Sequence, residues 1–287
     1  MSNMVVRTNV FALNSHRNMK NVGLEQGKAS NRLASGFRIN SAADDAAGLA
    51  ISETMRAQIR GLDQASRNAQ DANALIQTAE GGMNEITNML QRVRELTVQA
   101  ANDTNVDSNR EQIALEVNQL LSEIDDMAGR VEFNTRKLIE GSHSAGSDAL
   151  HFQIGANSTQ SLTLNIGSIE VSSIFTDPTA LWTDSFDVNN APTGSTVSDS
   201  IDLIQGALDK VSLERAKLGA VQNRLDYTMR SLDISSENLS GAESRVRNAD
   251  MAKEMMKFTM SNVLQQASTS MLAQANQMPN NLMQLLR

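Results

Sequence analysis

Between residues 62 and 93, apolar side chains recur at alternating three- and four-residue steps without a break. The members of this seam are Leu62, Ala65, Ala69, Ala72, Ile76, Ala79, Met83, Ile86, Leu90 and Val93. Such spacing puts them on one stripe of an α-helix, as in a coiled coil, over about 50 Å at 1.5 Å per residue. Gly81 and Gly82 lack the strand and the Lys-Ser/Thr of a phosphate loop, so we expect them to permit close helix contact. A helix this long needs other long helices to cover its stripe.

Two further seams supply those helices. The first follows the polar break at 102–107 and contains Ile113, Val117, Leu120, Ile124, Met127 and Val131. The second is late in the chain and contains Ile201, Ile204, Leu208, Val211, Leu218, Val221, Leu225, Met229, Leu232, Leu239, Ala242, Val246 and Ala249. Ser41 with Asp44, and Ser108 with Glu111, predict capping boxes that open the first two helices. We expect these two helices to fold back on each other and to pair with the late helix.

The middle of the chain, from 141 to 200, is rich in Gly, Ser, Thr, Asn and Asp. Apolar residues alternate with polar ones on both sides of 155–161, which predicts a β-hairpin; they are Leu150, Phe152, Ile154, Leu162, Leu164 and Ile166. Asp177-Pro178 and the run 190–194 predict irregular loop. The expected fold is therefore mainly α, a long helical coiled-coil rod formed by both halves of the chain, with a small β-hairpin region in the middle.

The two ends of the chain differ from the seams because their apolar faces are wide and their charges are few. Residues 5–34 predict a helix that ends near Gly36, and residues 249–278 predict one that stops at Pro279. No charged residue occurs in 258–286. We expect these helices to be loosely ordered in the free chain and to become ordered when copies assemble. The candidate polymerisation interface consists of Val6, Val10, Leu13, Met256, Met260, Val263, Ala267 and Met271.

Composition excludes several classes of protein. The aromatic content of 3% is too low for one large globule and suits closely packed helices. Residues 1–40 are basic, but no aromatic residues alternate with the basic ones, so nucleic acid is not an expected partner. The absence of cysteine excludes disulfides and thiol catalysis. No cleavable signal peptide is visible and the C-terminal span is too rich in Gln and Asn to insert in a membrane, which predicts a cytoplasmic chain or export without such a signal.

Two groups of residues could in principle form a metal site or a catalytic site, but neither has the spacing or the position that such a site needs. His143, His151 and Asp148 flank the hairpin at a spacing that matches no zinc pattern, so solvated loop histidines are expected. The Asp44-Asp45 pair is expected to stabilise a helix start rather than to act as a general acid. We expect no enzyme activity, no metal and no cofactor.

Four runs resemble the signatures of bacterial flagellins: LASGFRINSAADDAAGLAI at 33–51, QRVRELTVQA at 91–100, FQIGAN at 152–157 and LGAVQNRL at 218–225. The likeness covers roughly 1–170 and 200–287. It implies a homopolymer, the extracellular flagellar filament, whose terminal helices line a narrow central channel. It also implies a flagellar export chaperone, export through the type III apparatus, and contact with filament cap and junction proteins. Many flagellins insert outer domains where this chain has only the short interval 167–200, so it resembles a minimal form.

The resemblance also implies recognition by host Toll-like receptor 5. The positions carried over by motif are Gln91, Arg92, Leu96 and Glu116, with a charged Arg92–Glu116 pair beside an exposed Leu96. The alternative is that this face packs against neighbouring subunits in the filament.

The same likeness divides the chain into five segments. They are 1–40 and 247–287, the helices of an inner filament-core domain; 41–142 and 201–246, the helices of a rod domain; and 143–200, the hairpin and short irregular region of that rod domain. Two alternatives stay open, a hook-filament junction protein and a long helical-hairpin signalling protein. The motifs at 91–100 and 152–157 favour flagellin over the former, and the β-hairpin and uncharged tail argue against the latter.

Overall fold

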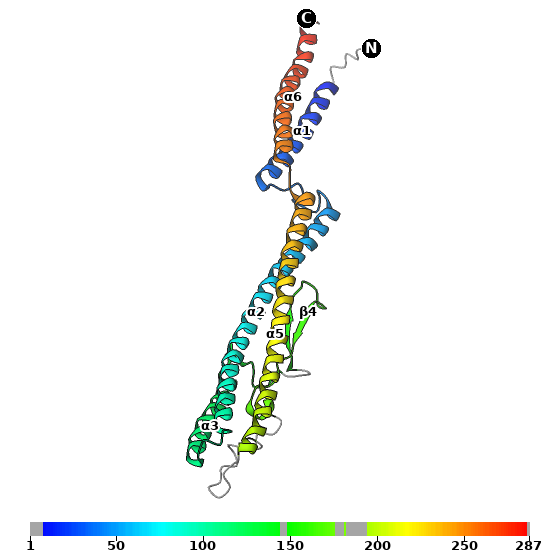
Figure 1. The fold of residues 1–287 in the computed structure, drawn as a ribbon. Coiled ribbons are helices and arrows are strands. Elements are labelled where there is room, and N and C mark those ends of the chain that lie inside the picture. The colour runs from blue at the N-terminus through cyan, green and yellow to red at the C-terminus, as the bar shows by residue number, and fades with distance from the viewer. Residues whose placement is uncertain (1–7, 144–147, 176–180, 182–193, 286–287) are drawn as a thin grey trace. The chain divides into compact units, whose positions relative to one another are not determined.

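The computed structural model of the chain describes residues 8–143, 148–175, 181 and 194–285. The elements, shown in Figure 1, are α1 (Val10–Ser35), α2 (Ala46–Ala100), α3 (Asp107–Arg130), β1 (Glu132–Phe133), β2 (Arg136–Lys137), β3 (Leu150–Gln153), β4 (Ser161–Leu164), α4 (Val171–Ile174), α5 (Gly194–Arg247) and α6 (Met251–Leu285). The chain forms two compact units, one from residues 1–58 with 237–287 and the other from 59–236. Long helices with short antiparallel strand pairs confirm the expected fold class.

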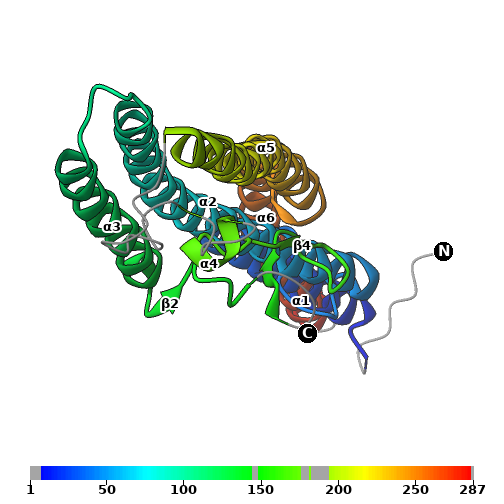
Figure 2. The same ribbon diagram turned by 60° about the horizontal axis from the view of Figure 1, so that its bottom comes forward.

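In the unit of residues 59–236, helices α2, α3 and α5 lie side by side (Figure 2). Polar side chains tie α2 to α5 at two points along the helices: the Ser66 hydroxyl donates to Asp233 at 3.1 Å, and the Gln222 amide donates to Glu80 at 3.3 Å. Helix α3 runs back along α2. An ion pair between Arg92 on α2 and Glu116 on α3, 2.9 Å apart, joins the two helices. The predicted fold-back and the pairing of the late helix are therefore confirmed.

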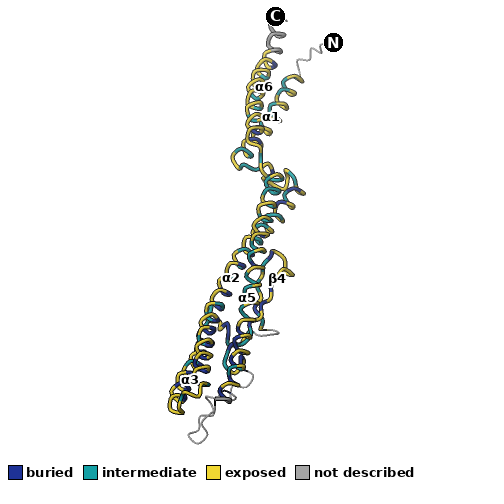
Figure 3. Tube along the Cα trace, viewed as in Figure 1, coloured by how far each residue is buried: buried dark blue, intermediate teal, exposed yellow. Residues whose placement is uncertain are grey.

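The predicted seams form the core of this unit. Every seam residue of α2 from Ala65 to Val93 is buried, as are Ile113, Val117 and Ile124 on α3. Helix α5 contributes six of its predicted residues to the buried set: Ile204, Leu208, Val211, Leu218, Leu225 and Leu232. The dark blue segments of Figure 3 follow this contact. Stripes at helical spacing from three helices thus exclude water from one another along most of their length.

The start of α2 differs from the predicted capping box. Residues 42–44 form a turn and α2 begins at Ala46. The Asp44 carboxylate accepts bonds from the N–H and the hydroxyl of Ser41, each at 3.1 Å, and these bonds lower the pKa of Asp44. The helix itself is capped by Asp45, which accepts from the Gly48 N–H at 2.9 Å. The prediction of a box failed because the acid that can reach a free N–H of the first turn is Asp45.

The second predicted capping box is also wrong. Helix α3 begins at Asp107, and its N-cap, Val106, makes no side-chain cap bond. The connection from α2 is held by Arg110 instead, whose Nε donates to the Ala100 carbonyl at 3.1 Å. Arg110 is only 7% exposed and also pairs with Asp103 at 3.1 Å. A guanidinium with several donors replaces the expected Ser–Glu exchange.

The predicted β-hairpin is confirmed by β3 and β4, which pair antiparallel with Leu150 opposite Leu164. Its apolar face is turned into the core, since Leu150, Leu162, Leu164 and Ile166 are buried. Its turn approaches α2 at Gly61, where a Cβ would lie 2.9 Å from the Cβ of Ala156. Similarly, a Cβ on Gly82 would lie 2.6 Å from Val131 Cγ2, whereas none would touch Gly81. The expected close contact at the glycine pair therefore belongs to Gly82.

The middle of the chain contains more structure than the sequence indicated. Strands β1 and β2 form a second hairpin, turned by Asn134 and Thr135 with φ of 49° and 64°. Both residues occupy the left-handed region that a two-residue turn requires, and Thr in that position hides the usual Asn-Gly signal. The short α4 was also not predicted, and α5 begins at Gly194 rather than near 201. The loops expected at Pro178 and 190–194 lie largely outside the described residues.

Candidate assembly surface and the junction that holds it

Helix α1 ends where the sequence predicts. Gly36 adopts a left-handed conformation with φ of 75°, and its N–H donates to the Arg32 carbonyl at 2.9 Å. At the other end Asn9 is the N-cap, and its Oδ1 accepts from the Ala12 N–H at 3.0 Å. Residues 1–7, among them the predicted interface residue Val6, lie outside the described part.

The prediction that α6 stops at Pro279 is wrong: the helix continues to Leu285. A proline inside a helix removes the N–H that would bond the carbonyl four residues earlier, which here belongs to Ala275. That carbonyl accepts a bond at 2.7 Å from the Asn9 side-chain amide. An outside donor therefore satisfies the acceptor that proline leaves open.

Helices α1 and α6 pack on each other (Figure 1), yet most of their apolar side chains stay exposed. Among the large ones are Val10, Phe11, Leu13 and Leu24 on α1, and Met251, Met255, Met256, Met260, Val263, Leu264 and Met271 on α6. In Figure 3 these helices are mostly yellow and teal. The buried residues in the described part of this pair are Ala29, Ala275 and Glu254. A contact that fully buries so few residues leaves a large apolar surface without cover, which marks an interaction site.

The structure describes seven of the eight predicted interface residues, and all seven are exposed: Val10, Leu13, Met256, Met260, Val263, Ala267 and Met271. The sequence did not single out Phe11, Leu24 or Met251, which are equally exposed. Whether these side chains are exposed depends on how much of α1 is covered by α6 and how much of α6 by α1. The spacing of apolar residues in the sequence does not give that area.

The segment between α1 and α2 and the segment between α5 and α6 pair with each other in a short ladder. The Arg38 N–H donates to the Arg247 carbonyl at 2.7 Å, and the Ala249 N–H donates to the Gly36 carbonyl at 2.9 Å. Phe37 and Asn248 lie between them as an antiparallel bridge. The bridge joins the segment that follows α1 to the segment that precedes α6, although they are more than 200 residues apart in sequence.

Cations stack on the aromatic ring at this ladder. The guanidinium carbon of Arg247 lies 4.9 Å from the centre of the Phe37 ring, and that of Arg56 lies 5.7 Å from it. Arg247 also pairs with Glu53 at 2.6 Å, and Arg56 with Glu243 at 3.2 Å. These contacts fix the ladder to the nearby ends of α2 and α5.

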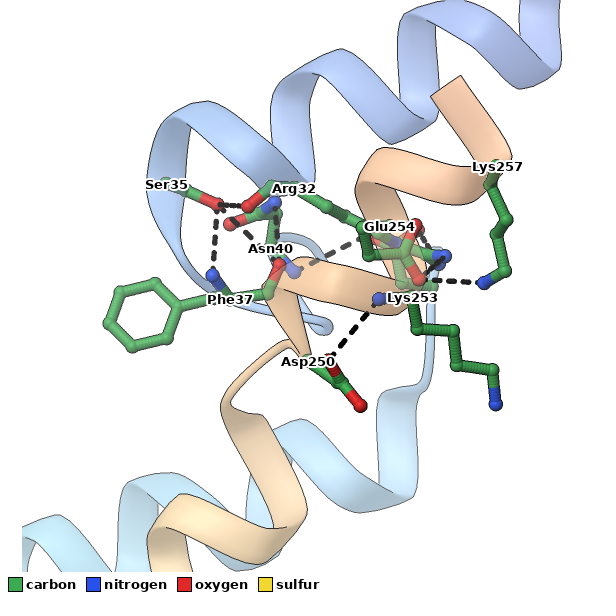
Figure 4. Close-up of polar contacts among 9 residues, drawn as sticks. Arg32, Ser35, Phe37, Asn40, Asp250, Lys253, Glu254 and Lys257 are labelled. Atoms are coloured by element: carbon green, nitrogen blue, oxygen red, sulfur yellow. Dashed lines mark hydrogen bonds and ion pairs between the residues drawn. The ribbon is translucent and has the colours of Figure 1, made fainter. Parts of the chain in front are cut away.

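A buried carboxylate joins the end of α1 to the start of α6 (Figure 4). Glu254 is 5% exposed and pairs with Lys257 at 2.6 Å and with Arg32 at 3.8 Å. Arg32 also lies 3.7 Å from Asp44. Asp250 caps α6 by accepting from the N–H groups of residues 252 and 253. Breaking a buried ion pair by removing one partner is strongly destabilising, so this cluster holds the helix ends in place.

The structure brings three of the four predicted receptor-contact residues to the surface. Gln91, Arg92 and Glu116 are exposed, and Arg92 pairs with Glu116 at 2.9 Å and with Glu95 at 3.3 Å. The bonds to Glu116 and then Glu95 raise the pKa of Arg92. The expectation of an exposed Leu96 is wrong, because its side chain is 2% exposed. Leu96 follows Val93 by three residues and so continues the buried stripe of α2.

One of the histidines near the hairpin contacts backbone. His143 Nδ1 lies 2.8 Å from the Asp148 carbonyl oxygen, a contact with backbone rather than with a third ligand. Within the part of the chain that the structure describes, no group of three His, Asp or Glu side chains could hold a metal ion. No helix in that same part is long and apolar enough to cross a membrane.

Comparison with known proteins identifies the family. Residues 6–144 match the bacterial flagellin N-terminal helical region, and residues 201–286 match the bacterial flagellin C-terminal helical region. The chain is 50% identical to a flagellin of Halalkalibacterium halodurans and 46% identical to one of Bacillus subtilis, in both cases over 99% of this chain and 100% of the relative. A crystal structure of Bacillus cereus flagellin, 28% identical, matches 58% of this chain and 88% of its own with a TM-score of 0.48. The chain therefore belongs to the bacterial flagellin family and is a structural subunit of the extracellular flagellar filament, not an enzyme.

Proposed function

We propose that α1 and α6 form the surface through which copies of this chain pack together in the filament. The observation that carries the proposal is the uncovered apolar face of these helices, together with the absence of charge from 258 to 286. A face of this kind is stable in water only where other protein covers it. Because the family forms a filament, the covering protein is another copy of the chain.

Assembly would also order these helices. Full burial of a Val, Leu or Met side chain contributes about 1.5–3 kcal/mol, whereas fixing each residue of backbone costs roughly 1–2 kcal/mol. In the free chain α1 and α6 bury little beyond Ala29 and Ala275. The balance favours loose order in the free chain and firm order once neighbours cover Met256, Met260 and Val263.

The remaining parts of the chain take their roles from this arrangement. We assign 1–40 and 247–287 to an inner filament core that lines the export channel, and 41–142, 143–200 and 201–246 to the surrounding rod domain. The uncovered terminal helices are also the surface for an export chaperone, for the type III apparatus, and for the cap and junction proteins. Each of these partners would cover apolar surface that the free chain leaves in water.

Filament growth from the purified chain tests the proposal directly. Short seeds added to monomer should grow into long tubes of constant diameter. Sedimentation measures how much monomer is incorporated, and electron microscopy shows the tubes. If seeded monomer stays in the supernatant under conditions that leave the 59–236 unit folded, the terminal helices are not sufficient for assembly and the proposal is wrong.

A second role, binding of Toll-like receptor 5, is favoured by the exposed network of Arg92 with Glu95 and Glu116. Arginine at the centre of two carboxylates is held in one geometry, which suits a contact with a protein partner. Gln91 extends this polar surface along α2. Because Leu96 is buried, the proposed contact is polar and does not include that side chain.

We expect Arg92→Ala to weaken receptor binding by at least about fivefold, since interface arginines are among the residues whose loss matters most. Surface plasmon resonance with the immobilised receptor ectodomain measures the change. Arg224→Ala, which removes another exposed arginine from α5, is the matched control. Equal affinities for the Arg92 variant and the unmodified chain would remove this face as the receptor site.

A further inference from the structure

Asn9 makes two different hydrogen bonds with one side-chain amide. Its Oδ1 accepts from the Ala12 N–H at 3.0 Å, which caps α1, and its Nδ2 donates to the Ala275 carbonyl of α6 at 2.7 Å. An asparagine amide can accept and donate at once, whereas serine, threonine or aspartate at an N-cap would supply the first bond without this amide donor. The residue therefore serves both helices.

The acceptor on α6 is unusual because its own helix cannot satisfy it. The helical partner of the Ala275 carbonyl would be the N–H of residue 279, and residue 279 is proline. Ala275 is 6% exposed, so water has little access to this position. A buried backbone carbonyl without a donor costs about 1–3 kcal/mol. Asn9 supplies the missing donor, and α6 continues past the proline to Leu285.

The bond lies at one end of an antiparallel helix pair whose other end is also fixed by a polar contact. Low numbers on α1 meet high numbers on α6 at Asn9 and Ala275, and the order is reversed at Arg32 and Glu254, 3.8 Å apart. Between these ends Ala29 is buried, and Met19 and Val22 on α1 and Phe258 and Leu272 on α6 are half-buried. Because a helical stripe repeats with every turn, a slide by one turn, about 5.4 Å, would again bring partly buried side chains of the two stripes together. The polar contacts at the ends distinguish one register from the next.

We propose that Asn9 is a positioning residue that recognises the carbonyl left open by Pro279 and so sets the register of α1 on α6. The register decides whether Val10 and Leu13 on α1 lie beside the correct residues of α6 in the combined apolar face. A filament repeats one contact between identical copies, so only chains in that register add to it. The inference depends on the proposed assembly role of these helices and adds to it the residue that aligns them.

The test is a double-mutant cycle on the full chain, read as the critical monomer concentration for seeded filament growth. Asn9→Ser keeps a capping oxygen but removes the amide donor, and we expect it to raise the critical concentration about fivefold. Pro279→Ala restores an N–H four residues after Ala275. In that background we expect Asn9→Ser to change the critical concentration less than about twofold, because α6 then satisfies its own carbonyl.

The control is Asn14→Ser, the same chemical change at an exposed position of α1. Its effect, whatever its size, should be the same with Pro279 and with Ala at that position. An unchanged critical concentration for Asn9→Ser, or an equal effect of Asn9→Ser in both backgrounds, overturns the register inference while leaving the assembly proposal intact. Failure of the unmodified chain to grow on seeds would instead contradict the assembly proposal itself.

Discussion

Met260→Asp should stop filament growth while leaving the unit of residues 59–236 folded. Met260 lies on α6 and is 59% exposed, so the free chain tolerates a carboxylate there. In the assembled state the same position would be enclosed by neighbouring copies. The region 258–286 contains no cation, and Lys257, three residues before Met260, already pairs with Glu254 at 2.6 Å. An unpaired buried charge costs about 3 kcal/mol or more, which corresponds to over 100-fold in the critical monomer concentration.

Sedimentation after seeding measures this change, and circular dichroism of the soluble variant reports on its helices. Met260→Leu is the matched control, because it keeps an apolar side chain of similar volume and should grow normally. Filaments of Met260→Asp at the ordinary monomer concentration would show that this face of α6 is not enclosed by neighbours.

Ile86→Ala is expected to have the largest effect on the stability of the other unit. Ile86 has no exposed surface and lies at the centre of the α2 seam, between the stripes of the helices that pack on it. Truncating such a side chain removes buried methyl groups and leaves a cavity, which lowers the free energy of unfolding by about 2–5 kcal/mol. Urea unfolding followed by circular dichroism measures the loss.

The neighbouring Glu85→Ala changes an exposed residue of the same helix turn and should stay within about 0.5 kcal/mol of the unmodified chain. A loss as small for Ile86→Ala as for Glu85→Ala would mean that the seam is not the core of this unit.

The sequence predicted the long helices well because their signal is repeated. Each step of three or four residues from Ala65 to Val93 independently favours the same stripe, so local errors do not change the result. The hairpin of β3 and β4 was predicted for a similar reason, since apolar alternation on both sides of a polar turn fixes its register.

Features that depend on one or two contacts were not predictable in this way. Either Asp44 or Asp45 could have capped α2, and the choice depends on a turn that closes on Ser41. Leu96 was expected to be exposed because a family motif placed it beside a charged pair, whereas its spacing from Val93 continues the buried stripe. The motif resemblance led to an exposed Arg92–Glu116 pair, which the structure contains, but not to the direction of the Leu96 side chain.

The proposed assembly surface could be inferred from the sequence as apolar residues without charge, but the contacts that hold α1 on α6 could not. Glu254 appears in the sequence as an ordinary acid in a first helical turn, and its burial beside Arg32 depends on residues over 200 positions apart. Pro279 predicted a helix end because the donor that compensates for it, Asn9, comes from the opposite end of the chain. Such long-range pairs become apparent only when the two helices are seen together.

The most direct test of the account is amide hydrogen exchange of α1 and α6, measured on the free chain in dilute solution and on the filament. We expect these amides to exchange rapidly in the free chain and at least about 100-fold more slowly in the filament, while the α2 core is protected in both. Slow exchange of α1 and α6 in the free chain, equal to that of the α2 core, would contradict the claim that these helices need other copies to cover them.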